Sequence, residues 1–164
     1  MKKVFAFEIE NIDSLASWLG KGLSGYALQS APHGRLTTLW LFLCDDSVLK
    51  IQSIVTTVGS WHEVGTLVFR GLKKSDVYLD AVLLESTWSD IAAVEQLVLD
   101  EEEFSAASGI AILNRSGAEI IVLSGAYPHT VEILAPFFDG DFQPEYEISA
   151  YQRRPLGNNR KLGC

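Results

Sequence analysis

The residues of this chain best suited to acid–base chemistry are neighbours, Trp61, His62 and Glu63. An imidazole beside a carboxylate and an aromatic ring can transfer protons near neutral pH. In an extended strand, however, successive side chains point to opposite faces, so His62 and Glu63 would face apart. We therefore expect His62 to have a structural role on a strand face. If the protein is an enzyme, His62, Glu63 and His129 are the candidate catalytic residues.

The other metal-binding and nucleophilic residues are isolated. His33, His62 and His129 lie far apart, and none falls in an HxH or HExxH pattern; nor is there a CxxC pair. A metal site would require distant residues to converge, so we expect none. Cys44 closes an apolar run and precedes two aspartates. Because neighbouring carboxylates disfavour the thiolate, we expect Cys44 to be a buried, unreactive residue at a strand end.

Motifs for nucleotides and for serine hydrolases are missing. The sequence has no GxxxxGK[ST] loop and no GxGxxG loop, and the segment 122–126 lacks the first glycine of a GxSxG elbow. No cofactor is therefore expected.

Charge is distributed very unevenly along the chain. From Asp76 to Glu147 there are fifteen Asp and Glu residues and one basic residue, Arg115, so this stretch carries a charge of −14. The residues on either side of it are net positive. Such a field repels nucleic acid and anionic lipid and attracts a basic protein. We therefore expect neither nucleic-acid nor membrane binding.

The densest acidic run is Asp100, Glu101, Glu102 and Glu103. Such a run is either a solvated turn that aids solubility or a surface that steers a basic partner. Aromatic residues are interleaved with the acidic stretch, among them Tyr127 and Tyr146. Aromatic anchors surrounded by carboxylates suit a protein interface, so we predict a partner-binding surface at residues 100–103, Tyr127 and Tyr146.

Length and composition predict one soluble domain. A chain of 164 residues, 48% hydrophobic and 21% charged, can bury roughly 70% of its unfolded surface. We expect a globular domain over residues 1–155 and a disordered basic tail over 156–164. The four bases near the end are either a solvated tail, a phosphate contact or a strap on the protein's own acidic surface; they are Arg153, Arg154, Arg160 and Lys161. Without a secretory signal or apolar span, the cytoplasm is the expected compartment.

The hydrophobic pattern predicts an α+β fold, a single antiparallel meander with one or two packed helices. Asn11 is the expected N-cap of a helix over Ile12 to Leu19, followed by a glycine-rich loop over 20–35. Short turns separate the expected strands, too short for the crossovers that parallel strands need. These strands cover residues 4–9, 36–44, 48–58, 61–70, 77–85, 109–113, 118–123 and 145–151. Residues 89–104 and 127–137 fit either helix or strand.

This pattern favours a small acidic binding protein, with an inhibitor or immunity-type role against a basic protein as the leading hypothesis. The alternative is a hydrolase or metal-dependent enzyme built from converging histidines and carboxylates. The oligomeric state does not follow from the sequence.

Overall fold

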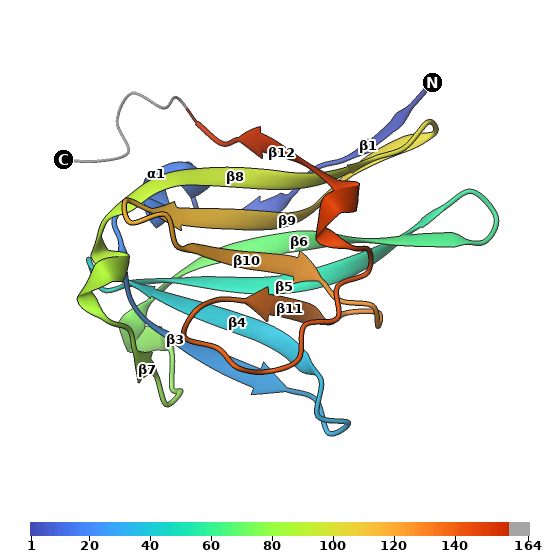
Figure 1. Ribbon diagram of the computed structural model, residues 1–164. Coiled ribbons are helices and arrows are strands. Elements are labelled where there is room, and N and C mark those ends of the chain that lie inside the picture. Colours follow the sequence, from blue (N-terminus) through green and yellow to red (C-terminus); the bar gives the residue numbers. More distant parts are fainter. Residues whose placement is uncertain (158–164) are drawn as a thin grey trace.

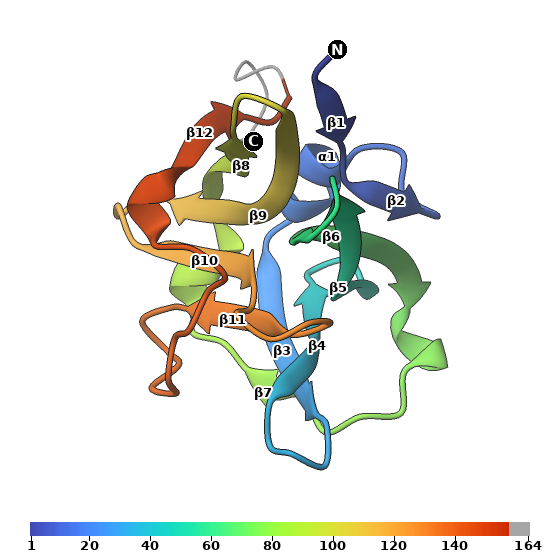
Figure 2. The ribbon, with the colours of Figure 1, turned by 90° about the vertical axis from the view of Figure 1, so that its right-hand side faces the viewer.

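The computed structural model describes residues 1–157, apart from the side chains of Ser86 and Thr87. These residues form two six-stranded sheets packed face to face (Figures 1 and 2). The elements in chain order are β1 Lys3–Phe5, β2 Glu8–Glu10, α1 Leu15–Leu19, β3 Leu23–Ser30, β4 Leu36–Leu43, β5 Ser47–Val58, β6 His62–Lys73, η1 Lys74–Asp76, β7 Val82–Leu83, η2 Ser86–Ser89, β8 Ile91–Asp100, β9 Phe104–Asn114, β10 Glu119–Ser124, β11 Val131–Leu134, η3 Ile148–Ala150 and β12 Tyr151–Pro155.

Sheet A has the order β11-β10-β9-β8-β12, with β1 added beside β9, and sheet B has the order β2-β6-β5-β4-β3-β7. Pairing is antiparallel except where the N-terminal strands join, since β1 is parallel to β9 and β2 is parallel to β6. Two residues separate β1 from β2, so the N-terminal segment passes directly from one sheet to the other. Phe7 fills this crossing by packing edge-on against Phe69.

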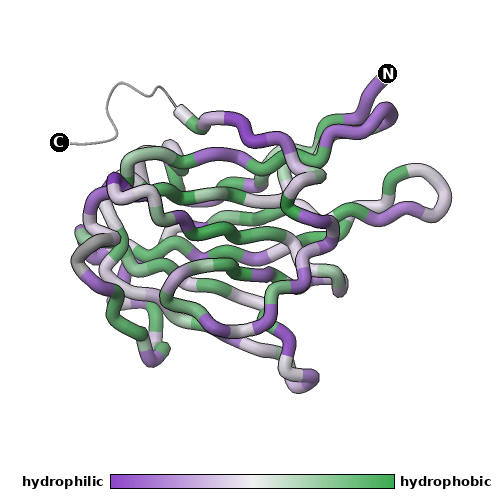
Figure 3. The backbone as a smooth tube through the Cα atoms, in the orientation of Figure 1, coloured by the Kyte–Doolittle hydropathy of each residue, from purple (hydrophilic) through white to green (hydrophobic). Residues whose placement is uncertain are grey.

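The main core lies between the sheets. It contains inward-facing side chains of both, such as Leu41, Ile51 and Phe69 from sheet B and Ile112 and Val122 from sheet A. Hydrophobic residues follow the strands, whereas hydrophilic residues concentrate in the turns and in β12 (Figure 3). A second cluster joins β8, β9 and β10 to the C-terminal segment.

Of the expected antiparallel strands in the middle of the chain, those over residues 36–44, 48–58 and 61–70 are confirmed. Strands β4, β5 and β6 pair as consecutive hairpins. The first turn contains Asp45, whose carboxylate accepts hydrogen bonds from Ser47 and pairs with Lys21. The second turn contains Gly59, whose φ of +66° suits a residue without a Cβ. The hairpin of β9 and β10 is confirmed as well.

Helix contributes much less than expected. The only α-helix among residues 1–157 is the five-residue α1, and its N-cap is Ser14 rather than Asn11. Most of the ambiguous segment 89–104 forms β8, Ile91–Asp100. The apolar spacing there also fits a helix. As a strand, however, this segment makes backbone hydrogen bonds to β9 on one side and to β12 on the other.

Three further expectations about the sheets are wrong. The segment 20–35 contains strand β3 instead of a loop, and β7 pairs with β3 instead of β6. Gly25 accounts for the pairing of β7 with β3, because a Cβ there would lie 2.7 Å from the Val82 carbonyl oxygen. Gly25 thus leaves room for the neighbouring strand β7 and does not interrupt β3. The chain also builds two sheets where one was expected.

The C-terminal strand starts later than expected, at Tyr151 rather than Glu145. Arg153 pairs with Glu95 and Glu119, and Arg154 pairs with Asp100, so both close on the protein's own acidic surface. Arg160, Lys161 and most of the expected tail lie outside the described residues. Within residues 1–157, no helix has the length and apolarity needed to cross a bilayer.

Candidate functional site

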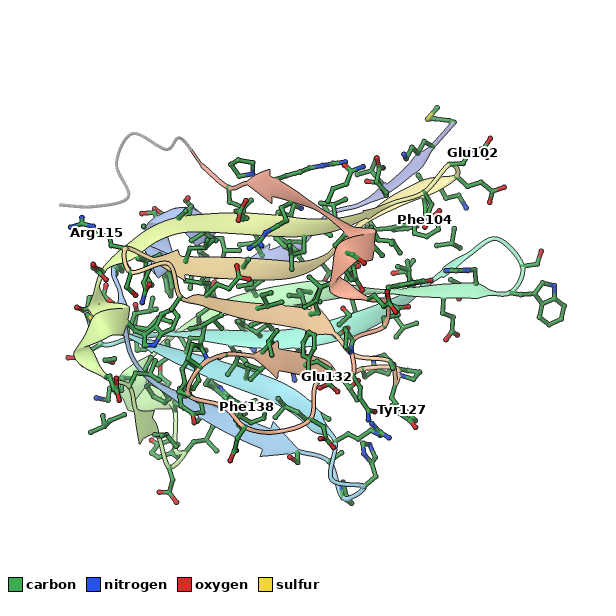
Figure 4. The ribbon with its side chains drawn as sticks, viewed as in Figure 1. Glu102, Phe104, Arg115, Tyr127, Glu132 and Phe138 are labelled. Carbon is green, nitrogen blue, oxygen red and sulfur yellow. The ribbon has the colours of Figure 1, made fainter. Side chains whose placement is uncertain are left out.

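Four segments far apart in the sequence meet at one end of the sandwich, which we call the hairpin end. They are residues 58–63, 100–104, 125–130 and 141–147. The turn between β5 and β6 and the turn between β8 and β9 line one cavity with the N-terminal residues. In Figure 4, Glu102, Phe104 and Tyr127 lie at this end and Arg115 at the opposite one.

His62, the first residue of β6, contacts Tyr146. The His62 Nε2 atom lies 2.7 Å from the Tyr146 hydroxyl, and the two rings stack with centroids 6.4 Å apart. The Phe104 ring lies 5.6 Å from the imidazole. Burial raises the pKa of Tyr146, and the charges of Glu145 and Glu101 raise it further. The phenol therefore keeps its proton at neutral pH and can donate it to an unprotonated Nε2.

Glu145 lies beside this pair and is more buried. Its Oε2 atom accepts a 2.9 Å hydrogen bond from the Gly65 N–H. Burial raises the pKa of Glu145; the hydrogen bond from Gly65 and the charge of His62 oppose this, and the charge of Glu63 adds to it. A carboxylate in this position gains from a cation placed beside it.

Gly65 allows the two sheets to approach closely here. A Cβ at this position would lie 2.6 Å from the Ser124 Cβ of sheet A. Hydrogen bonds cross the same interface, since Ser53 Oγ lies 3.0 Å from Ser124 Oγ and Ser108 Oγ donates to the Gly65 carbonyl. These contacts hold the two sheets firmly together beside the hairpin end.

Glu145 is at the base of a small slot of about 180 Å³. The slot is open to solvent and has two carboxylates, one aromatic ring and a proline in its lining; the residues are Ser53, Val55, Glu63, Gly65, Gly125, Ala126, Tyr127, Pro128 and Glu145. Small-molecule sites usually measure roughly 300–1,000 Å³, so this slot suits a single inserted side chain better than a free substrate.

The structure thus brings together most of the residues predicted from the sequence. His62 contacts Tyr146, while Glu63 lines the slot with Tyr127, so His62 and Glu63 do diverge as strand geometry requires. Residues 101–103 form the exposed turn between β8 and β9. Tyr127 is 49% exposed, and the Arg35 guanidinium lies 3.3 Å from its ring centroid.

Asp100 differs from its acidic neighbours. Its carboxylate lies 2.6 Å from the Lys2 Nζ atom and also pairs with Arg154. The hydrogen bond from Lys2 lowers the pKa of Asp100, and the charges of Lys2 and Arg154 lower it further. Asp100 therefore fastens the N-terminal segment and β12 to β8, a structural task that separates it from the exposed residues 101–103.

The remaining histidines do not join His62. His129 is exposed on the turn before β11, with a φ of +61°. His33 lines a separate polar groove of about 450 Å³ with Arg35 and Glu132. Within residues 1–157, no three His, Cys, Asp or Glu side chains are grouped so that they can hold a metal ion.

Sequence reasoning placed Trp61 in a strand and did not single out Glu145. Trp61 is 95% exposed at the tip between β5 and β6, although tryptophan is usually largely buried. Its place directly after Gly59 and Ser60 was the signal that it belongs to a turn. Glu145 gave no local signal, because its partner Gly65 is 80 residues away.

No family model, curated protein or solved structure matches this chain. The function assigned below therefore rests on the geometry of the hairpin end.

Proposed function

We propose that the protein works by binding, and that its hairpin end holds a basic protein partner. The observation that carries this proposal is the exposure of Trp61, 95% of whose surface faces solvent at the tip of a hairpin. A tryptophan can bury roughly 150–250 Å² in an interface, and tryptophan is among the residues that most often supply binding hot spots. Trp61 therefore offers a large anchor that the fold itself does not use.

Charge around Trp61 favours a basic partner. Glu63 follows it closely in β6, and the exposed Glu101, Glu102 and Glu103 lie on the adjacent turn. Lys2 and Lys3 are near this turn, but the Lys2 amine is already paired with Asp100. Exposed carboxylates around an aromatic anchor steer a cationic surface into contact and then let the anchor desolvate.

The slot is the third feature of the proposed binding surface, after Trp61 and the exposed carboxylates. An inserted Lys or Arg side chain would place its charge beside Glu63 and Glu145 and its methylene groups against Pro128. The raised pKa of Glu145 shows that its charge is poorly solvated, so a cation would stabilise it. These features support an inhibitor or immunity-type role, in which this surface would cover a cationic active site.

The contact between His62 and Tyr146 favours a second candidate, a hydrolase using acid–base chemistry. The imidazole, the phenol and the nearby Glu145 are groups that such chemistry uses. The slot, however, is lined by Glu63 and Glu145 and not by His62. The geometry therefore supports binding better than catalysis.

Affinity capture from the native host, followed by mass spectrometry, tests the proposal. The bait proteins are the wild type, Trp61→Ala, and the triple variant Glu101→Lys, Glu102→Lys, Glu103→Lys. A control triple variant carries the same charge change at exposed sites elsewhere, Glu8→Lys, Asp76→Lys and Asp80→Lys. We expect one basic protein to be retained by the wild type and the control and lost from the other two. Equal retention by all four would refute the proposal.

A further inference from the structure

A second cavity lies at the opposite end of the sandwich, beside the Arg115 turn in Figure 4, and has a different character. It measures about 350 Å³ and its lining is mainly apolar and aromatic; the residues are Tyr26, Val82, Leu83, Leu84, Glu85, Trp88, Asn114, Ser116, Ala118, Pro136 and Phe137. This volume is at the lower end of the roughly 300–1,000 Å³ range of small-molecule sites. We propose that this cavity binds a small molecule with an apolar body and one amine.

Three aromatic rings give the cavity a rigid corner. The Tyr26 and Phe137 rings lie 4.7 Å apart, and the Trp88 ring meets Phe137 edge-on at 6.0 Å. Tyr26 and Trp88 are buried, so their positions are set by the core rather than by a ligand. A preformed wall of this kind costs little to organise on binding.

The outer wall is made by β7, a strand of two residues. It is held by the pairs Gly25–Leu83 and Tyr26–Val82, and by a hydrogen bond from the Leu84 N–H to the Ser24 carbonyl. Leu83 remains 83% exposed although it borders an apolar cavity. This wall can admit a ligand without disturbing the sheet, because few bonds hold it.

The polar groups of the lining select a cation. Among residues 1–157, Glu85 is the one charged residue in the lining, and it is exposed at the rim. Arg115, between Asn114 and Ser116 of the lining, has its Nε atom 3.9 Å from an Asp90 carboxylate oxygen, so its charge is partly offset. A protonated amine can pair with Glu85 while the aromatic rings receive the body of the ligand and add cation–π attraction. An anion would be repelled by the Glu85 carboxylate at the rim.

Three indoles that differ mainly in charge test this proposal by isothermal titration calorimetry. They are tryptamine, the neutral indole-3-ethanol and the anionic indole-3-acetate. We expect tryptamine to bind at least tenfold more tightly than the alcohol, and the acetate not to bind. Glu85→Gln, an exposed substitution that leaves folding intact, should reduce tryptamine to the affinity of the alcohol and leave the alcohol unchanged.

Ala118→Leu places bulk in the cavity and should weaken tryptamine and the alcohol at least tenfold, with folding checked by thermal melting. Equal binding of the three indoles, no binding of tryptamine, or binding indifferent to both substitutions would overturn the proposal. The cavity and the hairpin end are at opposite ends of the molecule, so this result is independent of the test for a basic partner.

Discussion

The Tyr146 hydroxyl lies 2.7 Å from His62 Nε2, across 84 residues of sequence. This contact ties the hairpin of β5 and β6, which carries Trp61, to the segment that supplies Glu145. The rings also stack, and Phe104 packs against the imidazole from the neighbouring turn. Three segments of the hairpin end are thereby fixed around one histidine.

Removing either partner of this contact should weaken the fold modestly. We expect a double-mutant cycle of His62→Ala and Tyr146→Phe, followed by urea unfolding at pH 7, to give a coupling energy of about 0.5–1.5 kcal/mol. Tyr78→Phe, at a residue 91% exposed, is the control and should change stability by less than about 0.5 kcal/mol. A coupling indistinguishable from zero would mean that the contact does not hold the hairpin end together.

Gly65 should be intolerant of even one methyl group. A Cβ would lie 2.6 Å from the Ser124 Cβ, so Gly65→Ala must push the sheets apart or displace the Glu145 carboxylate. We expect a loss of about 1–3 kcal/mol in the free energy of unfolding. Adding Ser124→Gly removes the obstructing side chain, and the double variant should lose less than the two single variants together. If the loss of stability in the double variant equals the sum of the losses in the two single variants, this explanation is contradicted.

The charge on Glu145 should make stability depend on pH. Because the pKa of Glu145 is raised in the folded state, the folded protein holds this proton more tightly than the unfolded chain does. Stability is therefore lost as pH rises from the unfolded value through the raised one. Glu145→Gln keeps an acceptor for the Gly65 N–H without the charge, so it should be more stable than the wild type at pH 7.

Urea unfolding of Glu145→Gln and wild type at several pH values checks this expectation. The greater stability of Glu145→Gln should disappear below about pH 4, where residue 145 is neutral in both proteins. Glu147→Gln, an exposed neighbour, is the matched control and should show no such trend. A Glu145→Gln variant less stable than the wild type at pH 7 would show that the carboxylate charge stabilises the site.

Cys44 should be reactive towards thiol reagents in the folded protein. The sequence predicted a buried residue, but the side chain is exposed, because β4 ends at Leu43 and Cys44 starts the turn. With Cys164→Ser to remove the other thiol, we expect complete labelling of Cys44 in native buffer. Labelling that requires denaturant would show that the turn is closed. Cys44→Ala should cost less than about 0.5 kcal/mol.

The predictable part of the fold was the part with short-range signals. The turns at Asp45, Gly59 and Gly117 separate apolar runs, and the hairpins around them form as expected. Partners distant in sequence were not predictable. The pairing of β7 with β3 depends on Gly25, which as a sequence signal only indicates a loop. The same holds for β8, whose strand form depends on neighbours on both sides.

The candidate site likewise contains residues that could be predicted from the sequence and residues that could not. His62, Glu63 and residues 101–103 stand out in the sequence as charged or titratable residues beside turns, and the structure gathers them at one end. Glu145 and the slot were not predictable, because they depend on Gly65 and on the approach of two sheets. Asp100 looked equivalent to its neighbours, and only the fold places Lys2 and Arg154 beside it.

The most direct test of the central claim is the salt dependence of the association rate with the captured basic partner, measured by stopped flow or surface plasmon resonance. As the Debye length falls from roughly 30 Å at 0.01 M to about 8 Å at 0.15 M salt, the on-rate for the wild type should drop steeply. Reversing Glu101, Glu102 and Glu103 to lysine should lower the on-rate and flatten this slope. Each exposed reversal should change stability by less than about 0.5 kcal/mol. An on-rate that ignores both salt and the triple reversal would contradict the account.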